Sequence, residues 1–324
     1  MLATILFVGC EKKSSVRIRI DGLAQGTFYS IVYLSENGIN YKHEIDSLLQ
    51  MIDKSVSLWD TNSILYRVNN NEEVPLDSIF LDNFQKSQYL SRLTGGAFDI
   101  TVGSLVNAWG FGNTSPSNPD TKQIDSLLRL TGYEKVWLEN GFLKKQLPNI
   151  RIDFNAIAQG FTSDFIATFL ESKNIGNFIV NIGGEVIAKG YKEGKQPWVC
   201  GIETPAKDSV APIALQAKVK LKNKALVTSG SYRKYRMVDG AKISHSIDPR
   251  TGYPVKHRLL SATVLADEAW EADGLATAFM VMGLDSAKIF LKKHPNYEAF
   301  FVFTDNNDSL KTFATHGMQK IVLH

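Results

Sequence analysis

Short segments in which apolar and polar residues alternate occur in pairs along this chain, and each pair is joined by a tight turn. These pairs restrict the folds that the chain can adopt. Val16, Ile18 and Ile20 alternate with arginines, Asp21-Gly22 predicts a turn, and residues 27–34 form a second strand-like segment. Three similar pairs are expected at 136–142 around an Asn-Gly turn, at 178–188 around Gly-Gly, and at 300–314. Strands joined by such short turns run antiparallel.

Helical patterns lie between these strand pairs without regular alternation. Apolar residues at i, i+3, i+4 and i+7 predict a helix over residues 41–52. Further helices are expected at 77–93, 123–130, 268–282 and 286–293, and further strands at 217–221, 226–228 and 261–265. A doubly wound parallel sheet would need strands and helices in regular alternation. We therefore predict an α+β protein with a mostly antiparallel sheet and packed helices.

The first fifteen residues differ in character from the rest. Met1–Gly9 is an apolar run, too short to span a bilayer, and it is followed by Cys10 and a polar stretch. An apolar run that ends in a small residue and a cysteine resembles a bacterial lipoprotein signal, in which Cys10 would carry the lipid. The alternative is a frayed apolar terminus with an incidental cysteine. We expect a signal and tether over residues 1–15 and a single domain over 16–324.

Composition excludes some classes of function. The 324 residues are 44% hydrophobic, which is enough for a substantial core. Lys and Arg total 36 against 33 Asp and Glu, and they are spread along the chain, so no basic stripe for nucleic acid is expected. The chain has two cysteines, Cys10 and Cys200, and the position of Cys10 at the terminus argues against a framework disulfide. Cys200 lies beside apolar residues and is expected to be a buried thiol.

A small-residue turn within residues 151–170 could bind an anion. We expect a short strand with Ile150, Ile152 and Phe154 on one face, then a turn over 156–160, then a helix. The helix is predicted to pack through Phe161, Phe165 and Phe169, which are spaced four residues apart. Small side chains let a ligand approach the main chain, and the helix start offers unpaired N–H groups. The alternative is an ordinary strand-to-helix connection.

Asp273 and Thr277 could bind a metal ion. They are four residues apart on an expected helix, so they share one face. A carboxylate and a hydroxyl group are hard oxygen ligands, which suit Mg²⁺. A hydrogen bond between the two side chains is the simpler alternative.

Several other residues have both a functional and a structural interpretation. His245, before a turn, could bind phosphate or move a proton, or it could be a solvated residue. Trp59, in a polar loop, could stack on a flat ring or lie at the edge of the core. Thr228-Ser229-Gly230 offers hydroxyl groups, and Asp99 is expected to cap the segment that follows it.

Taken together and in this order, these blocks resemble the ApbE family of FAD:protein FMN transferases. The resemblance extends from about Gly22 to Gly283. The blocks that carry it are Gln25-Gly26-Thr27, Ser57-Leu58-Trp59, residues 95–99 (GGAFD), 156–160 (AIAQG), 181–185 (NIGGE), 228–230 (TSG), 245–252 (HSIDPRTG) and 272–277 (ADGLAT). The HSIDPRTG turn and the helix with Asp273 and Thr277 are the most specific of them.

The resemblance implies an ApbE-like fold and a Mg²⁺-dependent enzyme. Such an enzyme breaks the pyrophosphate of FAD, passes the FMN phosphoryl group to a Thr or Ser hydroxyl group of a target flavoprotein, and releases AMP. Members of the family commonly have a lipoprotein-type N-terminus. The resemblance therefore also implies a protein of the bacterial cell envelope, anchored through Cys10 and facing the periplasm.

The resemblance also assigns residues to the site. Mg²⁺ would be held by the side chains of Asp273 and Thr277 and by the main-chain carbonyl of Ala156. FAD would lie along Gln25, Trp59, Ala97, Phe98, Asp99, Gln159, Ser229 and Gly230, with His245 near the pyrophosphate. Phosphoryl transfer also needs a base for the acceptor hydroxyl group. His245 is the candidate, and a metal-held carboxylate such as Asp273 is the alternative.

Two positions depart from the family pattern. Gln159 stands where many members have Lys, and Trp59 stands where many have Tyr. Either change could shift the balance from transfer to a protein toward transfer to water. Two alternative functions therefore stay open: a Mg²⁺-dependent FAD pyrophosphatase that yields FMN and AMP, and a periplasmic flavin-binding lipoprotein without catalysis.

Overall fold

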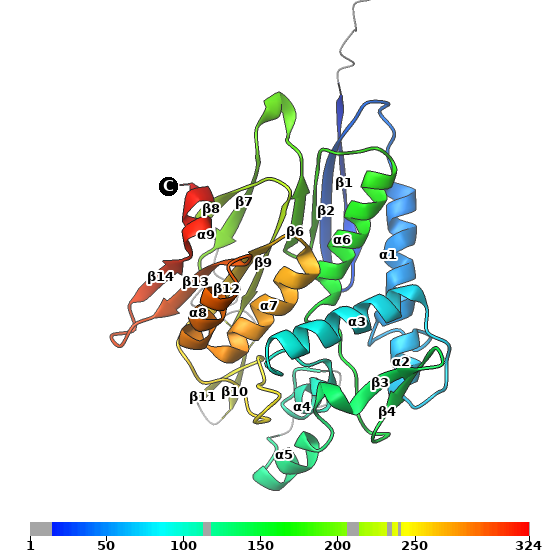
Figure 1. Ribbon diagram of the computed structural model, residues 1–324, viewed down its shortest axis with the longest axis vertical. Coiled ribbons are helices and arrows are strands. Elements are labelled where there is room, and N and C mark those ends of the chain that lie inside the picture. Colours follow the sequence, from blue (N-terminus) through cyan, green and yellow to red (C-terminus); the bar gives the residue numbers. More distant parts are fainter. Residues whose placement is uncertain (1–14, 113–117, 206–213, 232–234, 239–240, 324) are drawn as a thin grey trace, which may run out of the picture.

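A computed structural model describes residues 15–112, 118–205, 214–231, 235–238 and 241–323 (Figure 1). Cys10 lies outside these ranges. The largest element is an eight-stranded sheet in the order β1-β2-β5-β6-β9-β12-β13-β14. Its strands are β1 (Val16–Ala24), β2 (Thr27–Ser35), β5 (Phe178–Ile182), β6 (Glu185–Lys189), β9 (Lys224–Gly230), β12 (Leu259–Ala266), β13 (Glu298–Thr304) and β14 (Leu310–Ala314).

Neighbouring strands of this sheet pair antiparallel, which confirms the predicted α+β class. The predicted hairpins are present as β1–β2, β5–β6, β13–β14, and the separate pair β3 (Val136–Glu139) and β4 (Phe142–Lys145). The first turn was predicted at the wrong place. β1 continues through Asp21 and Gly22, and the chain turns at Gln25 and Gly26, whose φ angles are 52° and 71°.

Helices cover one face of the sheet. The predicted helices correspond to α1 (Lys42–Val56), α3 (Ser78–Leu93), α5 (Thr121–Leu128), α6 (Ala158–Ser172), α7 (Ala269–Met282) and α8 (Leu284–Lys293) (Figure 1). Short helices that the sequence patterns did not reveal are α2 (Ile64–Asn69), α4 (Gly103–Ala108) and α9 (His316–Ile321). None of the helices within the described ranges has the length and apolar character needed to cross a membrane.

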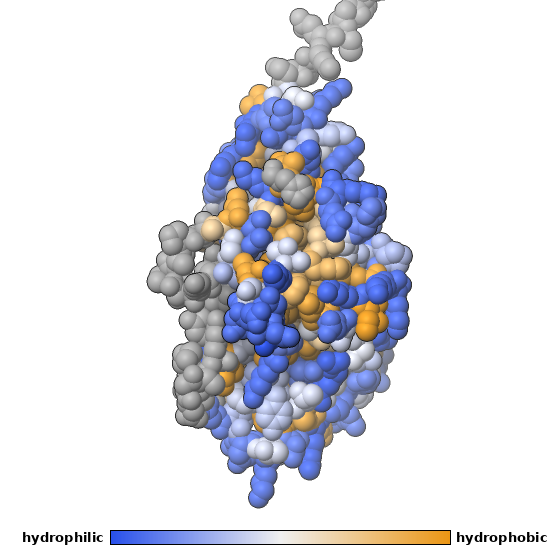
Figure 2. Space-filling model, turned by 90° about the vertical axis from the view of Figure 1, so that its left-hand side faces the viewer, coloured by the Kyte–Doolittle hydropathy of each residue, from blue (hydrophilic) through white to orange (hydrophobic). Residues whose placement is uncertain are grey.

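The sheet has a hydrophobic core on each face. Alternate residues of each strand, such as Ile31 and Val180, pack with α1, α6 and α7 in the main cluster. The residues between them, such as Val32, pack in a second cluster with a three-stranded sheet. That sheet has the order β15 (Val322–Leu323), β8 (Leu215–Leu221), β7 (Trp198–Glu203). Figure 2 shows the molecule from the side of α9 and β14, where hydrophilic residues surround separate hydrophobic patches.

The segment before α6 was predicted to be a short strand, and this prediction was wrong. Ile150, Ile152 and Phe154 are all buried, but the chain there is irregular. Its main chain pairs with a side chain instead of a strand: Asn69 Nδ2 donates to Ile152 O at 2.8 Å, and Ile152 N donates to Asn69 Oδ1 at 2.7 Å. A buried amide side chain offers one donor and one acceptor, as a peptide group does, so it replaces the neighbouring strand.

The core face of α6 also differs from the prediction. Phe161 is buried, but Phe165 and Phe169 are only partly buried. Ile166, Ala167 and Leu170 are buried in their place. Phe165 and Phe169 still pack against the edge of the main cluster. The prediction followed the largest side chains, whereas the helix buries smaller ones in the main cluster.

Candidate functional site

A cavity of about 1380 Å³ collects the residues that the sequence singled out. They come from seven separate parts of the chain: the β1–β2 turn, the loop after α1, the segment after α3, the start of α6, the end of β9, the residue after β11 (Ala241–Ser244), and α7. The predicted residues that line the cavity are Gln25, Trp59, Ala97, Phe98, Asp99, Ala156, Gln159, Ser229, Gly230, His245, Asp273 and Thr277. Every predicted site residue apart from Cys10, which lies outside the described ranges, therefore faces one space.

Helices α6 and α7 approach so closely that only glycine fits between them. A Cβ atom at Gly160 would lie 2.4 Å from the carbonyl oxygen of Ala269 and 2.7 Å from Cβ of Asp273. Gly160 N donates a hydrogen bond of 2.9 Å to Asp273 Oδ2. The sequence predicted small residues here for the approach of a ligand. The structure shows that Gly160 is also required for the approach of α7.

A second carboxylate makes the reciprocal contact. Asp164 of α6 accepts hydrogen bonds of 2.9 Å from the main-chain N–H groups of Ala269 and Trp270, at the start of α7. Each helix thus has N–H groups of its first turn bonded by a carboxylate of the other helix, which suits the helix dipole. Burial raises the pKa of Asp164 to about 7, against the effect of these hydrogen bonds.

The carbonyl group of Ala156 is available to a ligand. Ala156 precedes Ile157, the N-cap residue of α6, so its carbonyl group lies outside the hydrogen-bond pattern of the helix. Gly160 N donates to Asp273, and within the described ranges no main-chain N–H outside regular helices and strands donates to Ala156 O. Thr277 Oγ1 lies 3.2 Å from Ser229 Oγ, at the end of β9. Asp273 and Thr277 therefore bond to other partners rather than to each other, contrary to the simpler alternative.

Trp59 is exposed at the edge of the cavity. Its exposed fraction is 67%, so the interpretation as an aromatic residue at the core edge was wrong. The loop around it is tied down by Ser57, whose hydroxyl group accepts hydrogen bonds from Trp59 N and Asp60 N, each 3.1 Å. Ser63 Oγ donates to the carbonyl oxygen of Ser57 at 2.6 Å. The indole is thus presented on an ordered loop, where it could stack on a planar ligand.

Asp99 has the structural role that was predicted. Oδ1 accepts hydrogen bonds from Thr101 N (2.8 Å) and Thr101 Oγ1 (2.6 Å), and Oδ2 accepts one from Tyr133 N (2.8 Å). Burial raises the pKa of the Asp99 carboxyl group, and these hydrogen bonds oppose that shift. Gln25 also has a structural partner, because its Nε2 donates to Thr162 Oγ1 on α6 at 2.7 Å.

The cavity lining is strongly acidic. Its carboxylates are Asp53, Asp99, Asp153, Glu185, Glu203 and Asp273, whereas Arg236 is the one Lys or Arg among the described lining residues. Burial raises the pKa of both Asp153 and Asp273. Desolvated carboxylates of this kind favour a bound cation and repel a free anion. Sequence reasoning missed Asp53, Glu203 and Arg236, whose neighbours in the sequence carry no motif, and it assigned no role to Asp153.

The acidic lining fits a metal ion that takes few protein ligands. In the part of the chain that the structure describes, no three His, Cys, Asp or Glu side chains are grouped so that they could hold a metal. Zinc sites usually need such a group. Mg²⁺ instead binds through one or two carboxylates and completes its octahedron with water and phosphate oxygens. The donors Asp273, Thr277 and Ala156 O therefore fit Mg²⁺ better than a thiolate- or imidazole-bound metal.

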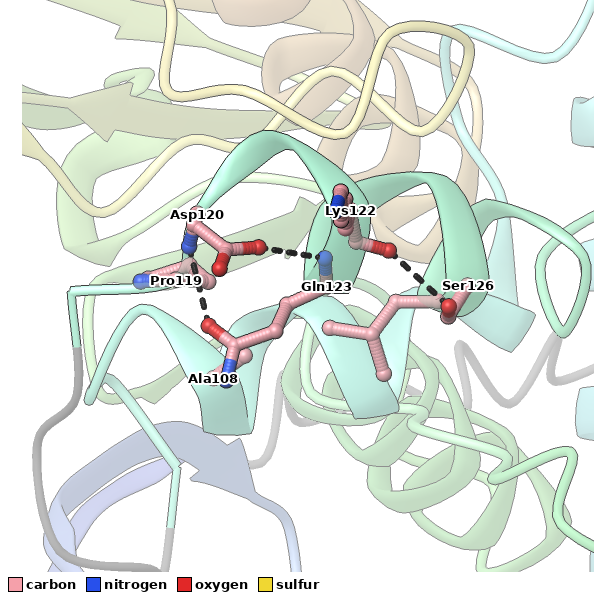
Figure 3. Close-up of a pocket in the computed structure, with 7 residues that line it drawn as sticks. Ala108, Pro119, Asp120, Lys122, Gln123 and Ser126 are labelled. Carbon is pink, nitrogen blue, oxygen red and sulfur yellow. Dashed lines mark hydrogen bonds between the residues drawn. The ribbon is translucent and has the colours of Figure 1, made fainter.

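A second hollow, of about 410 Å³, lies between α4 and α5 and has no such chemistry (Figure 3). Its polar groups belong to the capping box of α5. Asp120 Oδ1 accepts from Gln123 N at 2.8 Å, and Gln123 Oε1 accepts from Asp120 N at 2.9 Å. Ser126 Oγ donates to the carbonyl oxygen of Lys122 at 2.9 Å. These contacts form the start of the helix and need no ligand to explain them.

Comparison with known proteins points to one family. The model of the ApbE family matches residues 25–301. The FAD:protein FMN transferase of Vibrio cholerae is 34% identical over 98% of this chain and 96% of its own length. The protein of that name from Escherichia coli K12 is 33% identical over 97% of this chain and 93% of its own length.

Solved structures agree with the sequence matches. The flavin transferase ApbE from Vibrio cholerae superposes with a TM-score of 0.84 and 32% identity, and the match covers 95% of this chain and 99% of that one. The apo form of the flavinyl transferase ApbE from Pseudomonas stutzeri has a TM-score of 0.85 and 28% identity, and the match covers 96% and 98%.

The contact between α6 and α7 predicts the effect of Gly160→Ala. The added methyl group would overlap Ala269 O, push the helices apart and lengthen the bond from Gly160 N to Asp273. We expect the free energy of unfolding to fall by about 2–4 kcal/mol, at the upper end for overpacking. Denaturant unfolding measures this. Gly176→Ala is the matched control, because a Cβ there meets nothing within 4 Å. Equal stability of the two variants would contradict the prediction.

Proposed function

We propose, from the premise that this chain belongs to the ApbE family, that it transfers the FMN phosphoryl group of FAD to a Thr or Ser hydroxyl group of a target flavoprotein in a Mg²⁺-dependent reaction. Relatives that are 33–35% identical over at least 89% of their length carry the name FAD:protein FMN transferase. The chain is accordingly an enzyme that transfers FMN from FAD to a protein. The metal ion and the type of acceptor residue are the parts that we propose.

One observation carries the proposal: the residues assigned to FAD and to Mg²⁺ from seven parts of the chain line one acidic cavity. A pyrophosphate is an anion and would be repelled by this lining alone. Mg²⁺ bound to Asp273, Thr277 and the carbonyl of Ala156 would neutralise charge on the phosphate oxygens and so favour attack at phosphorus. The acidic lining and the anionic substrate are thus compatible when a divalent cation lies between them.

The reaction itself is a substitution at phosphorus. The acceptor hydroxyl oxygen forms a bond to the phosphorus of the FMN half, the bond from that phosphorus to the bridging oxygen breaks, and AMP leaves with that oxygen. The proton of the hydroxyl group must pass to a base. The contribution of the protein is mainly to hold the two groups in line and to exclude water.

Individual residues would divide this work. Trp59 would stack on one flat ring of FAD. Gln25 and Gln159 would form hydrogen bonds with FAD, as donors or as acceptors. Ser229 and Gly230 would face the phosphates beside Thr277, with which Ser229 is already in contact. Ala97, Phe98 and Asp99 would form a wall whose position is fixed by the three hydrogen bonds of Asp99. His245 is the candidate base, and a metal-held Asp273 is the alternative.

The two departures from the family pattern bear on whether the FMN phosphoryl group passes to a protein or to water. Gln159 carries no charge. A Cβ atom added at Gly183 would lie 3.0 Å from Gln159 Oε1 and 3.1 Å from Glu185 Oε2, so the side chains of Gln159 and Glu185 both approach Gly183. A lysine here would add a cation to an acidic wall, whereas Gln159 leaves neutralisation to the metal. Trp59 has no hydroxyl group to offer. These differences favour testing hydrolysis of FAD as a competing reaction.

Incubation of the pure protein with FAD and Mg²⁺ tests the function directly. With a target flavoprotein present, we expect AMP release and a flavin that stays on the acceptor after acid precipitation. Removal of the metal with EDTA should stop both. AMP release that is equally fast without the acceptor would indicate a pyrophosphatase. FAD that binds and stays intact under every condition would indicate a binding protein and contradict the proposal.

The Asp273→Ala variant tests the metal assignment. We expect turnover to fall by roughly 10²–10³-fold or more, because the interaction of a metal with the phosphates contributes several kcal/mol. FAD binding, followed by flavin fluorescence, should persist, because most of the assigned FAD contacts lie on other elements. The matched control is Asp267→Ala, which removes an exposed carboxylate just before α7. Full activity of the Asp273 variant would remove this residue from the metal site.

We also propose that a lipid on Cys10 anchors the chain to a membrane of the bacterial cell envelope, with the catalytic domain in the periplasm. The support is the apolar run before Cys10 and the polar tether after it. We expect the wild-type chain to fractionate with membranes and the Cys10→Ser variant to lose its lipid, as mass spectrometry of the N-terminal peptide would show. An unmodified Cys10 in the wild-type chain would contradict the anchor.

A further inference from the structure

The segment Trp109–Phe111 at the end of α4 is held in a defined conformation. Gly110 has φ of +75°, Gly110 N donates to Asn107 O at 2.9 Å, and Phe111 N donates to Val106 O at 3.0 Å. These two bonds and the left-handed glycine form a Schellman motif, which ends a helix and fixes the direction of the next residues. Trp109 and Phe111 therefore leave the helix in set directions.

Trp109 bonds to two other parts of the chain. Its Nε1 donates a buried hydrogen bond of 2.8 Å to the carbonyl oxygen of Gly252, 143 residues away. Its own carbonyl oxygen accepts a hydrogen bond from Arg236 Nη1. The ring of Trp109 also packs against Tyr253, with centroids 6.1 Å apart. One residue thus ties the turn at 248–252 and the strand β10 (Tyr235–Val238) to α4.

The turn that Trp109 holds is continuous with His245. Val255 N donates to Ser246 O at 3.0 Å, Asp248 N donates to Tyr253 O at 2.9 Å, and Ile247 forms a bridge with Pro254. Residues 246–255 therefore form a small hairpin that begins directly after His245. Fixing Gly252 fixes the main chain from which the His245 side chain extends.

Phe111 contacts the His245 side chain itself. The two ring centroids are 6.2 Å apart and the ring planes make an angle of 67°, which is an edge-to-face arrangement. Both rings line the cavity. The neighbours behind them are apolar, because Ile247 and Trp109 belong to one buried cluster with Leu105 and Ile124. Phe111 thus restricts the plane of the imidazole ring.

We propose that Trp109 and Phe111 are positioning residues for His245, with Trp109 fixing the main chain beside it and Phe111 fixing the plane of its ring. The catalytic consequence rests on the proposed function, in which His245 lies near the pyrophosphate. The positioning of the His245 ring does not depend on the proposed function. Misplacement of a reacting group by about 1 Å can cost about a hundredfold in rate, so such contacts matter without any contact to substrate.

Nuclear magnetic resonance of the full chain with ¹³C-labelled histidine tests the positioning alone. The chain has six histidines, and the His245 Cε1–Hε1 signal is the one that disappears in His245→Asn. We expect this signal to move and broaden in Phe111→Leu, because the ring current and the restriction are both lost. Phe111→Tyr should keep it near its original position. Leu127→Ala is the control, since Leu127 packs in the same cluster but outside the contact with His245.

Kinetics test the consequence through a double-mutant cycle. We expect Phe111→Leu to lower kcat for AMP release from FAD, with Mg²⁺ and acceptor present, by about three- to tenfold, the range of an aromatic pair. The KM for FAD should stay within about twofold. The same substitution in the His245→Asn background should cause no further loss. Trp109→Phe, which keeps a ring but removes the donor to Gly252, should behave in the same way.

The outcomes separate this inference from the proposed function. A His245 signal that is unchanged in both Phe111→Leu and Trp109→Phe would overturn the positioning, whatever the activity. Equal losses of kcat in the wild-type and His245→Asn backgrounds would overturn the action through His245. A wild-type chain that releases no AMP would contradict the proposed function, while the signal of His245 would still decide the positioning.

Discussion

The contact between α6 and α7 is the constraint on which the rest of the site depends. Each helix bonds N–H groups at the start of the other through a carboxylate, with Asp273 on Gly160 and Asp164 on Ala269 and Trp270. The contact is possible only because Gly160 has no side chain. It brings Asp273 against the turn that contains the Ala156 carbonyl, which precedes the helix and lies outside its hydrogen-bond pattern. The same contact thus joins two helices and creates a set of oxygen donors.

The charge of the cavity follows from this arrangement and limits its chemistry. Bringing Asp273 and Asp153 out of water raises the pKa of each, because burial disfavours the ionised form. A divalent cation would offset that cost, and it would also attract a phosphate group that the carboxylates alone repel. Gln159 carries no charge, and Arg236 is the one Lys or Arg side chain in the described lining that could share this task. An acidic pocket and an anionic substrate are therefore compatible through the divalent cation that we propose.

Local patterns predicted the class of fold but not the details that depend on distant partners. Strand alternation and hairpin turns are set by neighbouring residues, so the antiparallel sheet was correctly predicted. The strand at 150–154 was wrong because its partner is one side chain, Asn69, which no periodicity reveals. The first turn was misplaced because Gln25, a residue without a strong turn signal, adopts positive φ. The convergence of the site was available only through the family resemblance, because Gly160 and Asp273 are 113 residues apart.

The loops of the cavity share a mode of attachment that sequence motifs do not show. The Trp59 loop is held by the hydroxyl group of Ser57, the segment before α6 by the amide of Asn69, and the turn after His245 by the indole of Trp109. Each anchor is a polar side chain that bonds to main-chain groups. Such bonds hold irregular segments in place where no strand or helix can, and at Asn69 and Trp109 they also give partners to main-chain groups that are buried. A change at one of these anchors would displace groups that face the ligand without removing any of them. The side chains that hold these loops therefore determine the geometry of the cavity as directly as the ligand-facing residues do.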